Sequence, residues 1–205
     1  MLRTLLSFLV RWTGLLCLPG GALWALAPTG VYISNFAFHT PNVFWKLFWP
    51  APLLMLLGLI GLQLRQSDRS GLAQKIGFLV AALGLVMVMA GDIGLYWLGI
   101  DDVFIVTAPA YHTFRIGLIV LAVGSILFAV TSPRDGALPS WGLLPFVLGS
   151  LCGLVSFSRD LGTFGAALWI LFGVGWAWLG FSLAVEGVTS YLRKRRSNKA
   201  APANP

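Results

Sequence analysis

Six long apolar runs, separated by short segments that carry charge, glycine or proline, dominate this chain of 205 residues. The runs cover residues 5–27, 43–64, 76–98, 114–131, 141–157 and 164–187. A helix needs about 20 predominantly apolar residues to cross the hydrocarbon core of a bilayer. The sequence therefore predicts an all-α membrane protein, a polytopic bundle of six transmembrane helices. We expect one domain over residues 1–196 and a disordered tail over residues 197–205.

Composition supports lipid as the medium around this bundle. Only 10% of the residues are charged and 58% are hydrophobic, whereas a soluble domain carries about 25% charged residues. The net charge of +7 does not indicate nucleic-acid binding, because the basic residues are scattered through short loops or gathered in the tail. We expect the lipid bilayer as the partner, leave other membrane subunits or self-association open, and expect no nucleic acid.

The distribution of basic residues predicts the orientation. If the N-terminus is inside, the cytoplasmic segments contain Arg3, Arg65, Arg69, Lys75, Arg134, Arg193, Lys194, Arg195, Arg196 and Lys199. The outer segments contain Lys46, Arg115 and Arg159. Because basic residues favour the cytoplasmic side, the sequence predicts a multi-pass protein of the plasma (inner) membrane with both termini in the cytoplasm.

The second apolar run has two interpretations. Pro50 and Pro52 lie inside it, so a spanning helix over residues 43–64 would be kinked at the two prolines. The alternative is a short interfacial helix that ends ahead of Pro50.

Small residues four positions apart predict close contacts between helices. The pairs are Gly77 with Ala81, Gly149 with Gly153, Gly173 with Ala177, and Gly180 with Ala184. Such pairs serve packing within one chain or homodimerisation, and we favour packing within the chain.

Charged residues inside apolar runs are costly and call for a partner or a function. Arg11 and Glu186 lie at comparable depths near the cytoplasmic ends of the first and last runs. They are a candidate structural ion pair. The alternative is that both side chains reach separately to the inner interface.

A second polar group gathers at the predicted outer mouth. Asp92 follows Ala90-Gly91, the next loop contains Asp101 and Asp102, and His112 and Arg115 open the following helix. Arg115 is the natural counter-charge for Asp92. These five residues are the candidate ligand or ion site, and the alternative is a structural Asp92–Arg115 pair.

Enzymatic and cofactor chemistry is not indicated. Ala90-Gly91-Asp92 lacks the second carboxylate that an aspartyl protease needs, and the two histidines lie outside the predicted helices, unlike the axial ligands of a transmembrane haem. We expect no cofactor, no metal and no catalytic residue. The tail residues Arg193, Lys194, Arg195 and Arg196 are a candidate lipid-binding segment, or they serve only to fix topology.

Three classes of function remain. The sequence favours a non-enzymatic accessory or scaffold component that acts through helix packing. A small transporter, channel or ligand sensor with a polar mouth around Asp92 and Arg115 is the alternative. A membrane enzyme is the least supported class.

Overall fold

A computed structural model describes the backbone of residues 2–37, 44, 46, 48–66, 70–98, 109–132, 140–159 and 162–200. Within these ranges it describes the side chains from residue 12 to residue 186, with the exception of residues 31–37, 140 and 162. In this part of the chain there are six α-helices and one π-helical turn. They are α1 (Leu2–Ala37), α3 (Pro50–Gln66), α4 (Leu72–Asp92), η1 (Ile93–Trp97), α5 (Pro109–Thr131), α6 (Ser140–Ser158) and α7 (Gly162–Ala200). The prediction of an all-α fold is confirmed.

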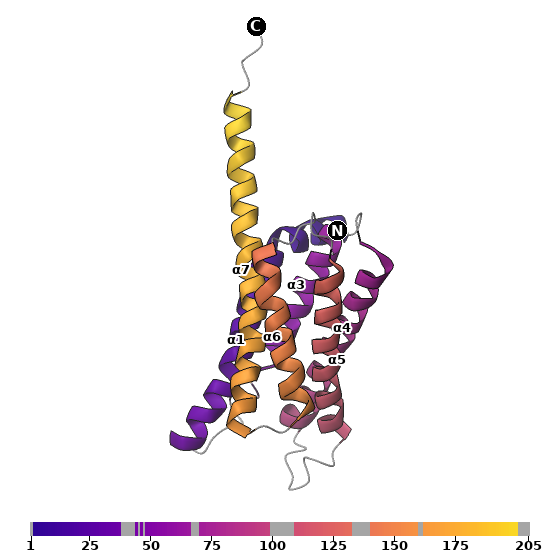
Figure 1. Cartoon of the computed structure of the whole chain (residues 1–205), viewed down its shortest axis with the longest axis vertical. Coiled ribbons are helices and arrows are strands. Elements are labelled where there is room, and N and C mark those ends of the chain that lie inside the picture. Colours follow the sequence, from indigo (N-terminus) through magenta and orange to yellow (C-terminus); the bar gives the residue numbers. More distant parts are fainter. Residues whose placement is uncertain are drawn as a thin grey trace.

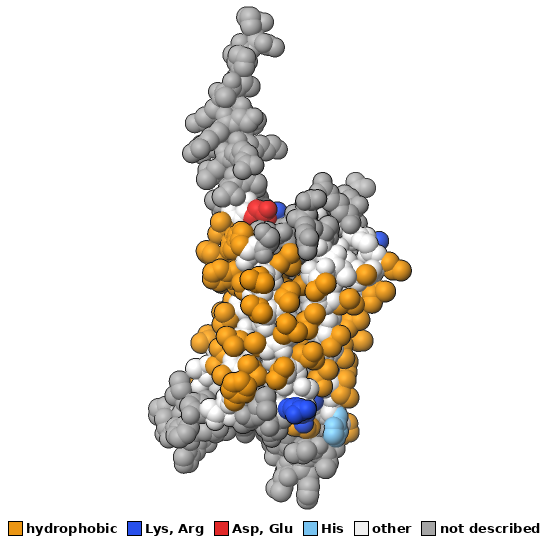
Figure 2. Space-filling view, in the orientation of Figure 1, with side chains coloured by type: hydrophobic (Ala, Val, Ile, Leu, Met, Phe, Trp, Pro, Cys, Tyr) orange, Lys and Arg blue, Asp and Glu red, His pale blue; other side chains and the backbone are white. Residues whose placement is uncertain are grey.

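Within the described residues, four segments are long and apolar enough to cross a membrane. They are Leu72–Trp97, Pro109–Thr131, Trp141–Ser158 and Thr163–Glu186. Their outward side chains are apolar, and Figure 2 shows hydrophobic groups over most of the visible side of the bundle. Leu79, Val130 and Leu144 are each more than 60% exposed, which suits lipid and not water. The protein is a polytopic membrane protein. The described part of the chain contains six α-helices, the number predicted. Four of the described segments are both long enough and apolar enough to span a membrane.

The helices form a closed ring in chain order. Each of the helices α1, α3, α4, α5, α6 and α7 contacts the next, and α7 contacts α1. The α-helices run roughly side by side in one bundle, and the start of α1 and the end of α7 lie at the same end of it (Figure 1). The last helix therefore closes the bundle against the first.

Glycines spaced seven residues apart bring two of these helix pairs close together. On α1 and α4 they are Gly14, Gly21, Gly77, Gly84 and Gly91. A β-carbon added to Gly91 would be 2.6 Å from the backbone nitrogen of Phe114 in α5, and one added to Gly173 of α7 would be 2.7 Å from the nitrogen of Ala25 in α1. A repeat of seven keeps the same face of one helix on its neighbour.

The small residues predicted at four-residue spacing also lie at contacts within the chain. Gly77 faces α5, Gly149 faces α7, and Gly173 and Gly180 face α1. These contacts confirm packing between helices of one chain.

Helix α1 extends further than the sequence predicted. The first apolar run ends at residue 27, but the helix continues to Ala37. Proline at position 28 removes one backbone donor, while the Thr29 hydroxyl donates a hydrogen bond of 3.0 Å to the carbonyl of Ala25. The carbonyl that Pro28 leaves without its helical donor is that of Trp24, so the Thr29 hydrogen bond supports the same turn of the helix without replacing the lost one.

Helix α3 begins at Pro50, whereas residues 43, 45 and 47 lie outside the described part of the chain, so a kinked helix over residues 43–64 stays a prediction. Phe44 and Lys46 have helical backbone, Phe48 and Trp49 form a turn, and the nitrogen of Ala51 donates to the carbonyl of Phe48 at 2.9 Å. Pro50 and Pro52 therefore occupy the first turn of α3, where the missing donors cost little. The alternative, a short interfacial helix that ends ahead of Pro50, also stays a prediction.

Helix α7 continues to Ala200, and Figure 1 shows it extending well beyond the rest of the bundle. The disordered tail over residues 197–205 stays a prediction. Residues 201–205 lie outside the described part of the chain.

Candidate functional site

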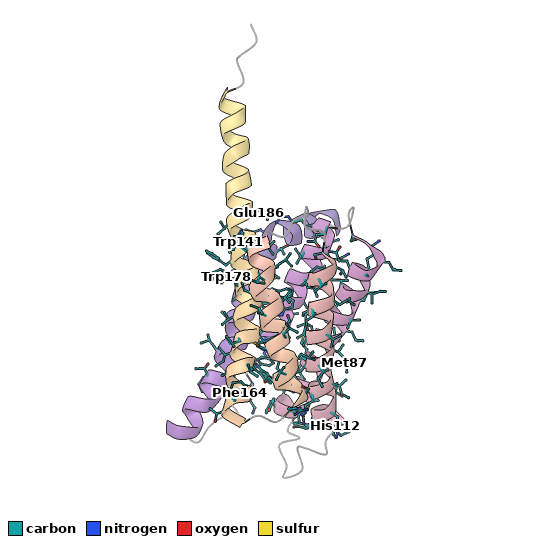
Figure 3. The ribbon with its side chains drawn as sticks, viewed as in Figure 1. Met87, His112, Trp141, Phe164, Trp178 and Glu186 are labelled. Atoms are coloured by element: carbon teal, nitrogen blue, oxygen red, sulfur yellow. The ribbon has the colours of Figure 1, made fainter. Side chains whose placement is uncertain are left out.

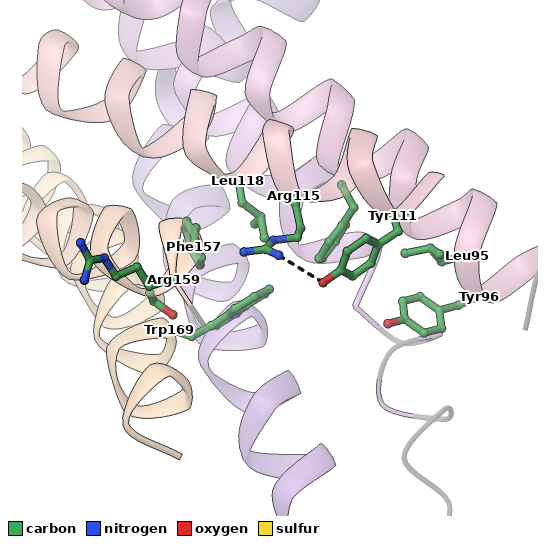
Figure 4. A pocket seen from close by; sticks show the side chains of 10 residues that line it. Leu95, Tyr96, Tyr111, Arg115, Leu118, Phe157, Arg159 and Trp169 are labelled. Atoms are coloured by element: carbon green, nitrogen blue, oxygen red, sulfur yellow. Dashed lines mark hydrogen bonds between the residues drawn. The ribbon is translucent and has the colours of Figure 1, made fainter. Parts of the chain in front are cut away.

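A pocket of about 260 Å³ lies at the end of the bundle opposite the chain ends, beside His112. Residues of η1, α5, α6 and α7 line it. Figure 3 shows His112 and Phe164 at this end, and Trp141 and Glu186 near the other. We call this cavity the Arg115 pocket, because the guanidinium of Arg115 faces its interior (Figure 4).

Arg115 is held by a residue one turn earlier on α5. Its Nη1 donates to the Tyr111 hydroxyl at 3.5 Å, and its guanidinium carbon lies 5.8 Å from the centre of the Tyr111 ring. Residues four apart on a helix share a face, so α5 itself sets this arrangement. The side chain of Arg115 is half-buried.

Further polar groups reach the same space from neighbouring elements. The hydroxyls of Tyr96 in η1 and Tyr111 in α5 point toward the side of the pocket that holds the Arg115 guanidinium (Figure 4). Ser156 of α6 also lines the pocket, and its hydroxyl donates to the carbonyl of Gly165 in α7 at 2.8 Å. Arg159 contributes to the rim, but its guanidinium points away from Arg115 in Figure 4.

Packed aromatic rings close the inner side of the pocket. The aromatic cluster consists of Trp24, Phe48, Phe114, Phe157, Trp169 and Phe172. Three of its members, Phe114, Phe157 and Trp169, also line the pocket. Ring centres are 5.0 Å apart for Phe157 and Trp169 and 6.2 Å apart for Phe114 and Trp169. The pocket therefore ends on a layer of rings that joins α1, α5, α6 and α7.

The sequence proposed five residues for this end, and the structure describes three of them. Arg115 lines the pocket, whereas His112 is exposed and packs edge-on against Tyr111. Asp92 is fully buried and does not line the pocket. Asp101 and Asp102 lie outside the described residues.

Asp92 and Arg115 form no ion pair. Both carboxylate oxygens of Asp92 are buried without a hydrogen-bond partner in the described part of the chain. Asp92 also immediately precedes the π-helical turn η1, which carries Leu95 and Tyr96 into the pocket wall. π-Helical turns are rare and often accompany functional sites.

At the other end of the bundle, Glu186 is paired with a residue that the sequence did not propose. Its Oε2 lies 3.8 Å from Nη2 of Arg65 at the end of α3. The side chain of Arg11 lies outside the described residues, so the Arg11–Glu186 pair stays a prediction. The side chains of Arg193, Lys194, Arg195 and Arg196 also lie outside them, and lipid binding by this segment stays a prediction.

Sequence reasoning missed Tyr96, Tyr111 and Trp169 as residues of the site. The four-residue spacing of Tyr111 and Arg115 was a usable signal, because it places both on one face of a helix. The contribution of Trp169 depends on α7 lying against α6, so that its ring reaches Phe114 of α5, and no local pattern reveals this.

Among the described residues, no three His, Cys, Asp or Glu side chains gather as a metal site would require. Compared with known proteins, the chain matches no family model, no curated protein and no solved structure.

Proposed function

We propose that this membrane protein is a non-enzymatic binding component that recognises a small molecule in the Arg115 pocket and does not conduct it across the bilayer. The observation that carries the proposal is the shared lining: Phe114, Phe157 and Trp169 belong both to the pocket and to the aromatic cluster. A ligand entering from the Arg115 end meets packed rings and stops there. This favours the ligand sensor among the transport and sensing alternatives.

The pocket faces the outside in this proposal, and both chain ends face the cytoplasm. The support is the sequence distribution of basic residues, which are concentrated in the segments at the Glu186 end and in the tail. The plasma (inner) membrane is the proposed location. Glycosylation or protease-protection reporters fused to either end would test this orientation.

Cysteine accessibility tests the blind pocket. In a background with both native cysteines replaced by alanine, Leu118→Cys introduces a thiol in the pocket wall, at a position that is 2% exposed in the parent and that the shorter side chain opens toward the cavity. Ser125→Cys introduces one two turns further along α5, at a fully buried position that is not in the pocket. A charged, membrane-impermeant thiol reagent should label Leu118→Cys from one side of sealed vesicles, and it should not label Ser125→Cys from either side.

Labelling of Ser125→Cys would reveal an aqueous path beyond the aromatic cluster and would support a conduit. Absence of labelling at both positions would contradict the pocket itself. Unchanged elution of both variants in size-exclusion chromatography shows that neither result reflects misfolding.

The accessory or scaffold class remains the second candidate, and the length of α7 favours it. This helix continues to Ala200, past the rest of the bundle, and so offers a long helical surface to a second copy or another membrane subunit. Truncation after Ser190 should leave the pocket labelling unchanged but reduce the number of copies per particle, obtained by dividing the molar mass from light scattering in mild detergent by the mass of one chain. An unchanged number of copies would remove self-association through this segment.

A further inference from the structure

We propose that the Arg115 pocket takes an amphiphilic anion, whose phosphate or carboxylate group contacts Arg115 and whose apolar part lies against Leu118, Phe114 and Trp169. This inference rests on the proposed binding function and names the chemical class of the ligand.

The charge of the pocket points to an anion. Among the residues that the structure describes, no acidic side chain lines it, and its inward-facing cation is the half-buried guanidinium of Arg115. A guanidinium has five N–H donors, whereas the contact of Arg115 with Tyr111 supplies one hydrogen bond, at 3.5 Å, and the face of a ring. Partial burial of a cation is unfavourable unless it is paired. Phosphate and carboxylate groups match the fork of donors with two charge-assisted hydrogen bonds.

Hydroxyl groups extend this anion-binding surface. Tyr96 and Tyr111 point their hydroxyls toward the same side of the pocket as the guanidinium (Figure 4). A phenolic hydroxyl can donate to an anionic oxygen, so a tetrahedral or planar anion beside Arg115 would have donors from both η1 and α5. The same hydroxyls do not discriminate phosphate from carboxylate.

The remaining wall is apolar and mostly aromatic. Phe114 and Trp169 stack with ring centres 6.2 Å apart and an angle of 24° between the ring planes, and Leu118 lies one turn along α5 from Phe114. Such surfaces bind hydrocarbon or aromatic groups and reject a hydrated ion. The volume of about 260 Å³ is below the ~300–1,000 Å³ of pockets for drug-sized ligands. It suits a headgroup and a short apolar segment, with any longer chain outside.

The outer surface beside the pocket is also apolar. Trp97 of η1, Ile116 of α5 and Phe164 of α7 are 55%, 51% and 64% exposed, and each lies close in sequence to a residue of the lining. An amphiphile that partitions into the membrane interface can therefore keep its chain against the lipid-facing surface while its headgroup reaches Arg115.

Calorimetric titration of the full-length protein in maltoside detergent tests the ligand class. The probes are octyl phosphate, octanoate, octyltrimethylammonium and inorganic phosphate. Octyl phosphate or octanoate should bind. The cationic probe should bind at least about tenfold more weakly because it makes no charge-assisted hydrogen bond to Arg115. Inorganic phosphate should also bind at least about tenfold more weakly because it has no apolar chain to bury against the rings. Arg115→Gln should weaken binding of the anionic probes at least about tenfold.

Arg159→Gln is the matched control, because it removes an equal charge from the pocket rim. The guanidinium of Arg159 points away from Arg115. It should change affinity less than about threefold. Equal losses in both variants would show a general charge effect and overturn the proposed contact. Equal binding of octyl phosphate and inorganic phosphate would overturn the apolar half of the proposal.

If neither anionic amphiphile binds while Leu118→Cys is still labelled from one side, the ligand class is wrong and the blind pocket stands. If Leu118→Cys is not labelled, the pocket proposal fails first. To separate the two sources of such an anion, the octyl phosphate titration is repeated in phosphatidylcholine nanodiscs with and without phosphatidylglycerol. Competition by phosphatidylglycerol identifies a lipid headgroup, and unchanged binding identifies a free amphiphile; either outcome supports an amphiphilic anion.

Discussion

Gly14 of α1 lies directly against Ala184 of α7: a β-carbon added to Gly14 would be 2.7 Å from the backbone nitrogen of Ala184 and 2.7 Å from the carbonyl oxygen of Gly180. Real β-carbons do not approach backbone atoms so closely, so any side chain at position 14 must push the two helices apart. Because α7 contacts α1 to complete the ring, this contact helps to close the whole bundle.

Replacement of Gly14 by leucine should therefore destabilise the protein. Overpacking a close contact costs ~1–3 kcal/mol and occasionally more, and we expect a value at the upper end because the opposing atoms are backbone. The midpoint of thermal unfolding in detergent measures the effect. Ala167→Leu, an exposed position on α7, should change the midpoint little. Equal destabilisation by both variants would mean that close packing of α1 on α7 is not the cause.

Apolar runs alone located most of the bundle. The predicted run 141–157 nearly matches α6, Ser140–Ser158, because a membrane segment must be apolar along its whole length. The breaks at proline were harder to predict. Pro28 lies inside α1 and Pro50 begins α3, and only the hydrogen-bonding surroundings of each proline decide between these outcomes.

Polar contacts between distant helices were not predictable from sequence. The pairing of Arg65 with Glu186 requires α3 and α7 to lie near each other. Closure of the ring brings these helices together, and no local spacing in the sequence predicts it. The proposed partnership of Asp92 and Arg115 assumed that similar depth on adjacent helices implies contact. In the structure, Asp92 lies in the buried interior while Arg115 turns to Tyr111.

A buried amide pair at the Glu186 end provides a second test of stability. Gln74 of α4 donates from its side chain to Oε1 of Gln66 in α3, and it lies 3.4 Å from the hydroxyl of Ser132. Gln74→Leu would leave the carbonyl oxygen of Gln66 buried without this donor. We expect a loss of about 1–3 kcal/mol in the free energy of unfolding, measured by thermal or denaturant unfolding in detergent.

Gln63 supplies the matched control for this prediction. Its Oε1 is buried and accepts no hydrogen bond within the described part of the chain. Gln63→Leu therefore removes a polar atom that is shielded from water and has no hydrogen bond to replace its hydration. The variant should be as stable as the parent protein or slightly more stable. Comparable destabilisation by the two substitutions would attribute the loss to amide removal in general and not to the Gln66–Gln74 bond.

Asp92 should tolerate neutralisation. Both of its carboxylate oxygens are buried without a partner in the described residues, so Asp92→Asn breaks no ion pair and removes an unpaired acidic group from an apolar interior. We expect unfolding stability to be unchanged or higher, and effects of Asp92→Asn and Arg115→Gln to be additive. Marked destabilisation by Asp92→Asn, with no further loss on adding Arg115→Gln, would instead indicate that the two side chains are paired.

The pairing at Glu186 can be resolved by charge exchange. The Arg65 and Glu186 side chains are 29% and 36% exposed and their charged atoms are 3.8 Å apart, so solvent screening limits the pair to ~0.2–1 kcal/mol. Arg65→Glu alone should therefore lower stability slightly, and the double exchange Arg65→Glu with Glu186→Arg should recover part of that loss. The same cycle with Arg11→Glu tests the sequence-predicted pair. If the Arg11 exchange recovers more stability than the Arg65 exchange, Arg11 is the stronger partner of Glu186. Recovery in neither cycle would show that Glu186 contributes no pairwise energy and that its position near the chain-end side of the bundle reflects hydration of an interfacial carboxylate.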